Sequence, residues 1–520
     1  MQSGAADIIG PASAAKLIQG ECRVKNKIKK LVVVGGGTAG WMSAALLKRV
    51  LGKELDIELV ESEDIGIIGV GEATIPPIQL ANAVLGLDEA DFLRETKSTI
   101  KVAIRFENWR RQGDSYYHTF GAPGRSQAFC HFHHFWTRAQ LAGYESNLWD
   151  YDLNYLCAEA NKFAKLQVED PVWELQYAYH FDASLYGQYL RRYSEKLGVT
   201  RTEGLIEDVK FDPENGFVES LQLKGGGTVT GDFFVDCSGL RGLLIHKALN
   251  TGYEDWGHWL PCDRAMAVPS VRFEKTLPFT RSIAHSAGWQ WRIPLQHRNG
   301  NGLVYSSRHY SDDEAADILL NNLDSEAIAE PKVIPFRTGR TRKQWNRNVV
   351  AVGLSSGFLE PLESTSIHLI QSAVVRLITL FPHAGVTPAL MDEYNRQSQF
   401  EFEYIRDFII LHYYLNERGD SQFWRDTRNM NVPDRITRKI ELFRSSGTLT
   451  KDNMDIFLEA SWLQVMLGQG VVPQDYHPLA DTLTDAQLRD KLEKTKKTKM
   501  QPLEKMPAHD NFLKMYLKTG

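Results

Sequence analysis

The segment KLVVVGGGTAGWMSAALLKRVLGKELDIELVE, residues 30–61, decides the fold of this chain. Its apolar start predicts a buried strand, its glycines a tight turn, and WMSAALLKRV a helix that leads into a second strand, DIELVE. This βαβ order is typical of an α/β fold. Gly35, Gly37 and Gly40 give the spacing G-x-G-x-x-G between strand and helix, where the backbone can approach a pyrophosphate held at the helix N-terminus.

An acidic residue completes this nucleotide-binding pattern. Glu61 ends the second strand about 20 residues after the glycines, where a carboxylate can accept hydrogen bonds from ribose hydroxyls. The glycine run at residues 225–227 lies between strand-like segments and predicts a hairpin turn instead. The residues predicted to bind the dinucleotide are Gly35, Gly37, Thr38, Ala39, Gly40 and Glu61.

The rest of the chain divides into two kinds of pattern. Short strand-like segments such as FFVDCS and NVVAVG alternate with helical ones such as residues 184–197, whereas long helical patterns dominate after Pro388. We therefore expect a flexible extension at 1–29, one discontinuous α/β module with interleaved substrate segments at 30–388, and a helical subdomain at 389–520.

Composition excludes several classes of protein. The net charge of −5 gives no reason to expect a nucleic-acid partner. The lysine-rich residues 489–499 also carry acidic groups and predict a solvated helix face, with a nucleic-acid arm as the alternative. The longest uncharged run, residues 31–47, is shorter than the roughly 20 residues that cross a bilayer, so no membrane span is expected.

Cysteine and histidine spacing gives no metal site. The five cysteines are scattered and form no C-x-x-C pair, which fits a reducing cytoplasm. In CHFHHFW, strand spacing would place His131 and His133 on one face, as in a metal pair, but no further ligand set accompanies them and His134. We expect no bound metal.

Two motifs point to a known family. The stretch GWQWRIPL, residues 288–295, supplies W-x-W-x-I-P, and GFLEPLESTS, residues 357–366, follows F-x-x-P-x-x-S-x-G except that Ser366 replaces the last glycine. On these motifs the chain resembles the flavin-dependent halogenases, in particular their tryptophan halogenase branch. The resemblance runs from about residue 30 to 473 and includes, in order, GEATIP, KVAIRF, YHTFG, HFDA and VDCSGLRGLLI.

The resemblance implies a fold and a chemistry. It implies a flavin monooxygenase-type FAD module with a helical pyramid, one FAD supplied as FADH2 by a separate NAD(P)H-dependent flavin reductase, and O2 and bromide or chloride as co-substrates. Hypohalous acid would then cross a tunnel to a small electron-rich aromatic substrate. A hydroxylating flavin monooxygenase and a non-catalytic flavin-binding relative are the alternatives, and a homodimer is compatible with the sequence.

The resemblance also assigns two catalytic residues. Lys101 matches the family's lysine, which hydrogen-bonds hypohalous acid or becomes an N-haloamine. The local pattern alone would place Lys101 with Ala103 and Arg105 on the solvated face of a strand. Glu363 matches the glutamate that stabilises the cationic intermediate, although Glu360 competes for this role.

Further residues take supporting roles by the same resemblance. Thr365 and Ser366 would hold the halide, although the glycine that Ser366 replaces leaves that geometry open. Trp289 and Trp291 would keep the substrate away from the flavin and so prevent direct oxygen transfer. The residues expected at the substrate pocket are His118, Phe120 and Ser364. Core packing is the alternative explanation for both tryptophans, for His118 and for Phe120.

One segment bears on the substrate. Tryptophan-specific members carry paired tyrosines and an acidic residue ahead of the segment that corresponds to Phe457–Pro473. Here residues 445–462 read SSGTLTKDNMDIFLEASW, without a tyrosine and with Leu458 after Phe457. A zwitterion would leave its charges unpaired in such a pocket, so we expect an uncharged, indole-like substrate.

Overall fold

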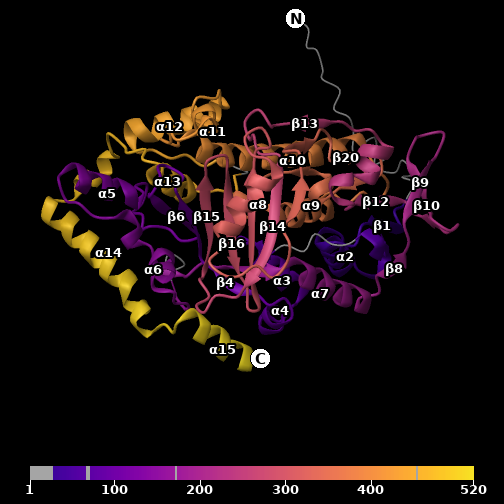
Figure 1. Ribbon diagram of the computed structural model, residues 1–520, viewed down its shortest axis with the longest axis horizontal. Helices are drawn as coiled ribbons and strands as arrows, with labels where there is room; N and C mark the ends of the chain where they lie inside the picture. The colour runs from indigo at the N-terminus through magenta and orange to yellow at the C-terminus, as the bar shows by residue number, and fades with distance from the viewer. Residues whose placement is uncertain (1–26, 66–70, 170–172, 453–454, 520) are drawn as a thin grey trace, which may run out of the picture.

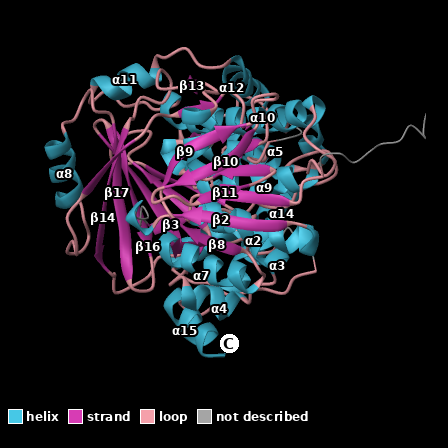
Figure 2. Ribbon diagram, turned by 90° about the vertical axis from the view of Figure 1, so that its right-hand side faces the viewer, coloured by secondary structure: helices cyan, strands magenta, loops and turns pink. Residues whose placement is uncertain are grey.

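The computed structural model describes residues 27–65, 71–169, 173–452 and 455–519. The flexible extension predicted for residues 1–29 lies almost wholly outside them. A six-stranded and a seven-stranded sheet lie next to each other, and helices cover them (Figures 1 and 2). The predicted α/β fold class is confirmed.

The predicted βαβ segment forms the centre of the six-stranded sheet. Its order is β20-β21-β12-β1-β2-β8, and all neighbours are parallel except β20 and β21. The strands are β1 (Lys30–Val34), β2 (Asp56–Glu61), β8 (Thr200–Glu203), β12 (Phe233–Asp236), β20 (Trp345–Asn346) and β21 (Val349–Ala351). Parallel strands buried on both faces require continuous apolar runs, which LVVV and FFV supply.

The seven-stranded sheet carries the W-x-W motif. Its order is β18-β14-β17-β16-β15-β5-β6, and β5 and β15 are its parallel pair. The strands are β5 (Ala103–Glu107), β6 (Ser115–Thr119), β14 (Arg264–Val271), β15 (Phe279–His285), β16 (Gly288–Pro294), β17 (Arg298–Tyr305) and β18 (Lys332–Pro335). In Figure 2 its strands β14, β16 and β17 run vertically beside β2 and β8.

Three small sheets complete the β structure of the described residues. They are β3 (Gly71–Ala73) with β7 (Ala178–Asp182) and β4 (Thr99–Lys101), β9 (Ile206–Phe211) with β10 (Val218–Leu223) and β11 (Thr228–Thr230), and β13 (Tyr253–Asp255) with β19 (Gly339–Thr341) and β22 (Gly357–Phe358). The turn at residues 225–227 joins β10 to β11, as predicted. The predicted strand KVAIRF is instead divided at Val102 into β4 and β5, whose backbones join different sheets.

Helices surround both large sheets. In the first part of the chain they are α2 (Thr38–Leu51), α3 (Ile78–Leu85), α4 (Glu89–Glu95), α5 (Phe132–Leu141), α6 (Leu153–Ala160), α7 (Ala183–Lys196), α8 (Asp312–Asn321) and α9 (Ser366–Thr379). Residues 388–519 supply α10 (Pro388–Tyr414), α11 (Gln422–Arg428), α12 (Asp434–Ser446), α13 (Glu459–Gly468), α14 (Asp485–Lys505) and α15 (His509–Thr519). Side chains of α10 to α14 share one apolar core with the seven-stranded sheet, whereas Leu513 of α15 packs in a second core cluster.

The lysine-rich segment forms part of α14, which lies along one edge of the molecule (Figure 1). Leu488 and Leu492 are buried on one side of the helix, which agrees with a solvated opposite face, but Lys499 is buried too. Within the described ranges, no helix combines the length and apolar character needed to span a membrane.

Candidate active site

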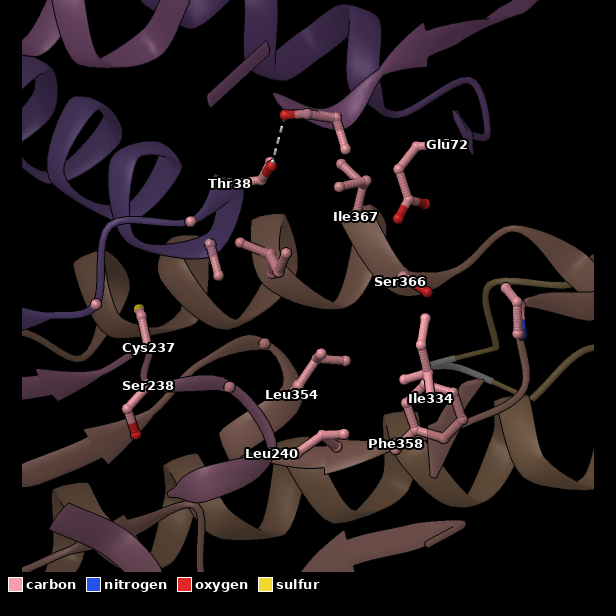
Figure 3. Close-up of a pocket in the computed structure, with 18 of the residues that line it drawn as sticks. Thr38, Glu72, Cys237, Ser238, Leu240, Ile334, Leu354, Phe358, Ser366 and Ile367 are labelled. Atoms are coloured by element: carbon pink, nitrogen blue, oxygen red, sulfur yellow. Dashed lines mark hydrogen bonds between the residues drawn. The ribbon is translucent and has the colours of Figure 1, made fainter. Parts of the chain in front are cut away.

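A cavity of about 1030 Å³ opens where β1 meets α2. Its wall includes the glycine loop, Glu61, the start of α9, and both tryptophans of β16. Figure 3 shows that α2, α9 and the segment after β12 approach it from different sides. This position, at the carboxyl ends of parallel strands, is the usual place for a nucleotide in an α/β sheet.

The glycine loop is shaped for close backbone contacts. A Cβ on Gly40 would lie 1.8 Å from the carbonyl oxygen of Gly35, and Gly35 itself has φ +109°, so neither position accepts a side chain. Gly37 faces open space and precedes α2 without capping it through a side chain. The first-turn amides of α2 are therefore available to an anion such as a pyrophosphate.

The loop holds the remaining predicted nucleotide contacts in place. Thr38 and Ala39 line the cavity, and the Thr38 hydroxyl donates to the carbonyl of Ala183 at 3.1 Å (Figure 3). Glu61 also lines it, and Arg201 Nε donates to its Oε1 at 2.6 Å, which fixes the carboxylate at the end of β2. These residues fit the adenosine and pyrophosphate of FAD.

The cavity has lining residues that sequence analysis did not assign. Ser238 and Leu240 come from the segment after β12, which passes directly beside Gly35, and Leu354 and Glu72 of β3 also line the cavity (Figure 3). Burial raises the pKa of Glu72 to about 7. Glu72 lies in the stretch GEATIP, and Ser238 and Leu240 lie in VDCSGLRGLLI, so the family resemblance could have marked these three, whereas Leu354 lies in neither stretch.

Lys101 lies beyond this cavity and is fully buried. It ends β4, and its Nζ donates to the Thr74 carbonyl at 3.0 Å and to Ser364 Oγ at 2.8 Å. The solvated position that its local pattern predicted is wrong, because the break at Val102 separates Lys101 from the face that carries Arg105. Burial lowers the pKa of Lys101 to about 7, while the carboxylate of Glu363 opposes this shift.

Glu363 is a buried carboxylate between two histidines. His118 Nδ1 lies 2.8 Å from Oε2, and His412 Nε2 lies 2.7 Å from Oε1. Burial alone would raise its pKa, but the charge and hydrogen bond of His118, together with His412, lower it to about 2. Glu363 is therefore ionised at neutral pH. His412, from α10, has no sequence signal of its own.

Glu360 has different surroundings. Its Oε2 accepts hydrogen bonds from Trp289 Nε1 at 2.9 Å and Tyr413 Oη at 2.6 Å. Burial raises its pKa to about 7, against these two hydrogen bonds. Glu360 is thus hydrogen-bonded to two aromatic side chains, whereas Glu363 interacts electrostatically with Lys101.

Ser364 connects the cavity to the lysine. It lines the cavity, accepts the hydrogen bond from Lys101, and has φ +59°, a backbone conformation that non-glycine residues rarely adopt. Thr365 and Ser366 follow at the start of α9, whose first turn no side chain caps. Ser366 also lines the cavity.

Aromatic side chains form the surroundings of the two charged residues. The ring of Phe120 lies 5.1 Å from Lys101 Nζ, and the ring of His118 lies 5.6 Å from Phe408 and 6.2 Å from Phe457. Trp289 and Trp291 stand on one face of β16 in the cavity wall. The structure thus brings together Lys101, Glu363, Ser364, His118 and Phe120, and lines the adjoining cavity with the two tryptophans.

The three neighbouring histidines do not share a strand. The predicted strand spacing is wrong because α5 begins at Phe132, so His133 and His134 are helical. His133 Nε2 lies 2.7 Å from the Gly447 carbonyl, and His134 Nδ1 accepts from the amide of His477. Over the ranges that the structure describes, no group of three or more histidine, cysteine or acidic side chains is arranged to hold a metal.

Comparison with known proteins gives one consistent match. The family model described as tryptophan halogenase matches residues 30–485. Tryptophan 7-halogenase RebH from Lentzea aerocolonigenes is 35% identical over 491 residues, which is 88% of this chain and 92% of RebH. Tryptophan 6-halogenase ThaL from Streptomyces albogriseolus is 35% identical over 87% of this chain and 91% of ThaL.

Solved structures agree with the sequence matches. Xcc4156, a flavin-dependent halogenase from Xanthomonas campestris, has a TM-score of 0.92 and 46% identity, and the alignment covers 94% of this chain and 98% of that one. BrvH, a flavin-dependent halogenase from Brevundimonas sp. BAL3, has a TM-score of 0.91 and 44% identity, with 95% and 100% covered.

Proposed function

We propose that this chain, a member of the tryptophan halogenase family of flavin-dependent halogenases, places bromine or chlorine on an uncharged, indole-like aromatic substrate. The observation that carries this proposal is the pairing of a buried lysine with a buried, ionised glutamate around Ser364, beside a cavity that fits FAD. A site that only bound flavin would not need these two buried charges, since burying a charge is costly.

The cavity would bind the cofactor and the halide. Reduced FAD, supplied by a separate NAD(P)H-dependent flavin reductase, would together with O2 oxidise the halide to hypohalous acid. Gly35, Gly37 and Glu61 would hold the nucleotide part of the flavin, and the uncapped start of α9 at Thr365 and Ser366 would attract the halide.

Lys101 would receive the oxidised halogen. Its Nζ already donates to Thr74 and Ser364, which orients the amine, and Ser364 reaches the cavity from which hypohalous acid would come. With a pKa near 7, the group supplies both an ammonium that can donate to the hypohalous oxygen and an amine that can take the halogen.

Glu363 would stabilise the positive charge that develops on the aromatic ring. A carboxylate fixed by His118 and His412 needs little reorganisation during the reaction, which is the condition for electrostatic stabilisation. Trp289 and Trp291 would separate the substrate from the flavin. This wall, and Lys101, argue against a monooxygenase that transfers oxygen directly, and the retained pair Lys101 and Glu363 argues against a non-catalytic relative.

The pocket chemistry favours a substrate without an amino-acid group. Phe408 and Phe457 present stacked rings, 3.9 Å apart, near His118. The acidic residues of the neighbouring segment, Asp452 and Asp455, lie 3.3 and 3.9 Å from the ammonium of Lys439, which would compete with a substrate ammonium for them.

The proposal is tested by assaying the purified protein with a flavin reductase, NADH, FAD, and bromide or chloride over a panel of indoles. Mass spectrometry should show the isotope pattern of a monohalogenated product. Hydroxylated product without halogen would indicate a monooxygenase, and hydrogen peroxide alone with every substrate would contradict the halogenase proposal for this panel. The same assay without reductase, with chemically reduced FAD, checks that the chain accepts reduced flavin.

A further inference from the structure

The strand that carries Lys101 is an edge strand. β4 has three residues and pairs with β7 on one side, in the order β3-β7-β4. Successive amides of a strand point to opposite edges. The amide of Ile100 points away from β7, because its hydrogen-bond acceptor is Nε2 of His509, at 3.2 Å, on the C-terminal helix α15. A side chain thus takes the place of a neighbouring strand.

His509 reaches a second backbone group at the same time. Its Nδ1 lies 2.9 Å from the carbonyl oxygen of Thr276, and the side chain is fully buried. Burial lowers the pKa of His509 to about 4, so the ring is neutral near pH 7. Since Nε2 accepts from Ile100, Nδ1 carries the ring proton and donates to Thr276.

The next residue anchors this arrangement. Asp510 accepts from the amide of Thr276 at 3.0 Å and from Arg272 at 2.6 Å. His509 and Asp510 therefore bind both backbone groups of Thr276, and His509 joins that segment to β4. Figure 1 shows α15 at the C-terminal end of the chain, close to α4. The match to the family model ends at residue 485, so α15 lies beyond it.

We propose that His509 is a positioning residue for halogen transfer: through the amide of Ile100 it fixes β4 and thereby the place of Lys101. This inference rests on the proposed catalytic role of Lys101. The ammonium of Lys101 must meet Ser364 on one side and the oxidised halogen on the other, and a displacement of about 1 Å in such a group can cost on the order of 100-fold in rate.

Two amide substitutions separate the two hydrogen bonds. In His509→Gln the side-chain oxygen can reach the position of Nε2 and still accept from Ile100. In His509→Asn the shorter side chain can reach Thr276, near the position of Nδ1, but not Ile100. Tyr516→Phe is the control, because it removes a hydrogen bond to Glu89, 2.8 Å long, from the same helix without touching β4.

The first measurement is hydrogen exchange of the peptide that contains Ile100, in the full-length protein without flavin. We expect faster exchange in His509→Asn and near-unchanged exchange in His509→Gln and Tyr516→Phe. The second is halogenation under saturating flavin: kcat should fall about tenfold in His509→Asn, as expected when a lost hydrogen bond lets a catalytic group shift, and stay within about twofold in the other two, with KM for the aromatic substrate unchanged.

The outcomes are distinct. Equal exchange in the Asn and Gln variants would overturn the assigned contact, whatever the enzyme does. Faster exchange in His509→Asn with unchanged kcat would overturn the positioning role while leaving the contact. A wild-type protein that halogenates nothing would overturn the proposed function and with it this inference, whereas the exchange results would still stand as a description of α15.

Discussion

The flavin cavity and the Lys101 pocket are built by opposite means. The cavity is large and its predicted cofactor contacts are mostly backbone amides at glycines, around the uncapped first turn of α2. The Lys101 pocket, formed by Lys101, Glu363 and Ser364, is buried, and its two charged side chains are held by hydrogen bonds to residues from other elements. A backbone site tolerates many side-chain changes nearby, whereas a site made of buried charges depends on every partner. Substitutions in the pocket should therefore stop halogen transfer and leave flavin binding intact.

The largest expected effect comes from Lys101→Ala. Halogenated product should fall by on the order of 1,000-fold or more, because the group that receives the oxidised halogen is gone. Hydrogen peroxide should still form at the wild-type rate, since the flavin cavity is unchanged. Product by mass spectrometry and peroxide by a coupled assay measure the two. Substantial product without leaked hypohalous acid would remove Lys101 from the mechanism.

The two buried glutamates give the next effect. Glu363→Gln should lower kcat about 100-fold, because it removes the preorganised negative charge beside the developing cation. Glu360→Gln should cost less than about tenfold, because its partners are Trp289 and Tyr413 and a pKa near 7 already leaves much of it protonated. Steady-state rates decide between them, and the reverse ranking would mean that Glu360 is the catalytic carboxylate.

The charge of the substrate should have a smaller effect on kcat/KM than the two substitutions above. Indole should have a kcat/KM at least about tenfold above that of free tryptophan, because residues 445–462 contain no tyrosine to bind the zwitterion and the ammonium of Lys439 already lies 3.3 and 3.9 Å from Asp452 and Asp455. Both substrates are compared with the same bromide and flavin supply. A higher kcat/KM for tryptophan would show that other residues replace the missing clamp.

The pH dependence of the rate reports on the charge pair. If the ammonium of Lys101 is the active form, kcat should fall as pH rises through about 7, where Lys101 loses its proton. The Glu363 carboxylate raises the pKa of Lys101, so in Glu363→Gln the same fall should occur at lower pH. A fall that moves to higher pH would contradict the assigned electrostatic coupling, and a rate that rises through pH 7 would assign the transfer to the neutral amine.

The smallest effect concerns the halide. With equal concentrations we expect at least as much brominated as chlorinated product, because bromide loses its water more easily on entering a buried site and Ser366 replaces the usual glycine there. The ratio is read from one competition mixture by mass spectrometry. Mainly chlorinated product would reject this preference.

The difference between the flavin cavity and the Lys101 pocket also explains which site residues could be predicted from the sequence. The glycine loop was predictable because its residues are contiguous and each has a steric reason, such as the 1.8 Å approach at Gly40. The position of Lys101 was not predictable from its local pattern, which indicates the solvated face of a strand. Only the family resemblance assigned Lys101 to the catalytic site. His412 and His509 gave no signal, since their partners Glu363 and Ile100 lie 49 and 409 residues away in the chain.

We propose that flavin binding and halogen transfer use separate parts of the molecule. The most direct test is to titrate FAD into wild-type protein and into the double variant Lys101→Ala, Glu363→Gln, following flavin fluorescence. We expect the same Kd within about twofold, because neither residue lines the cavity that the glycine loop helps to form. Loss of FAD binding in a double variant that remains folded by circular dichroism would contradict it.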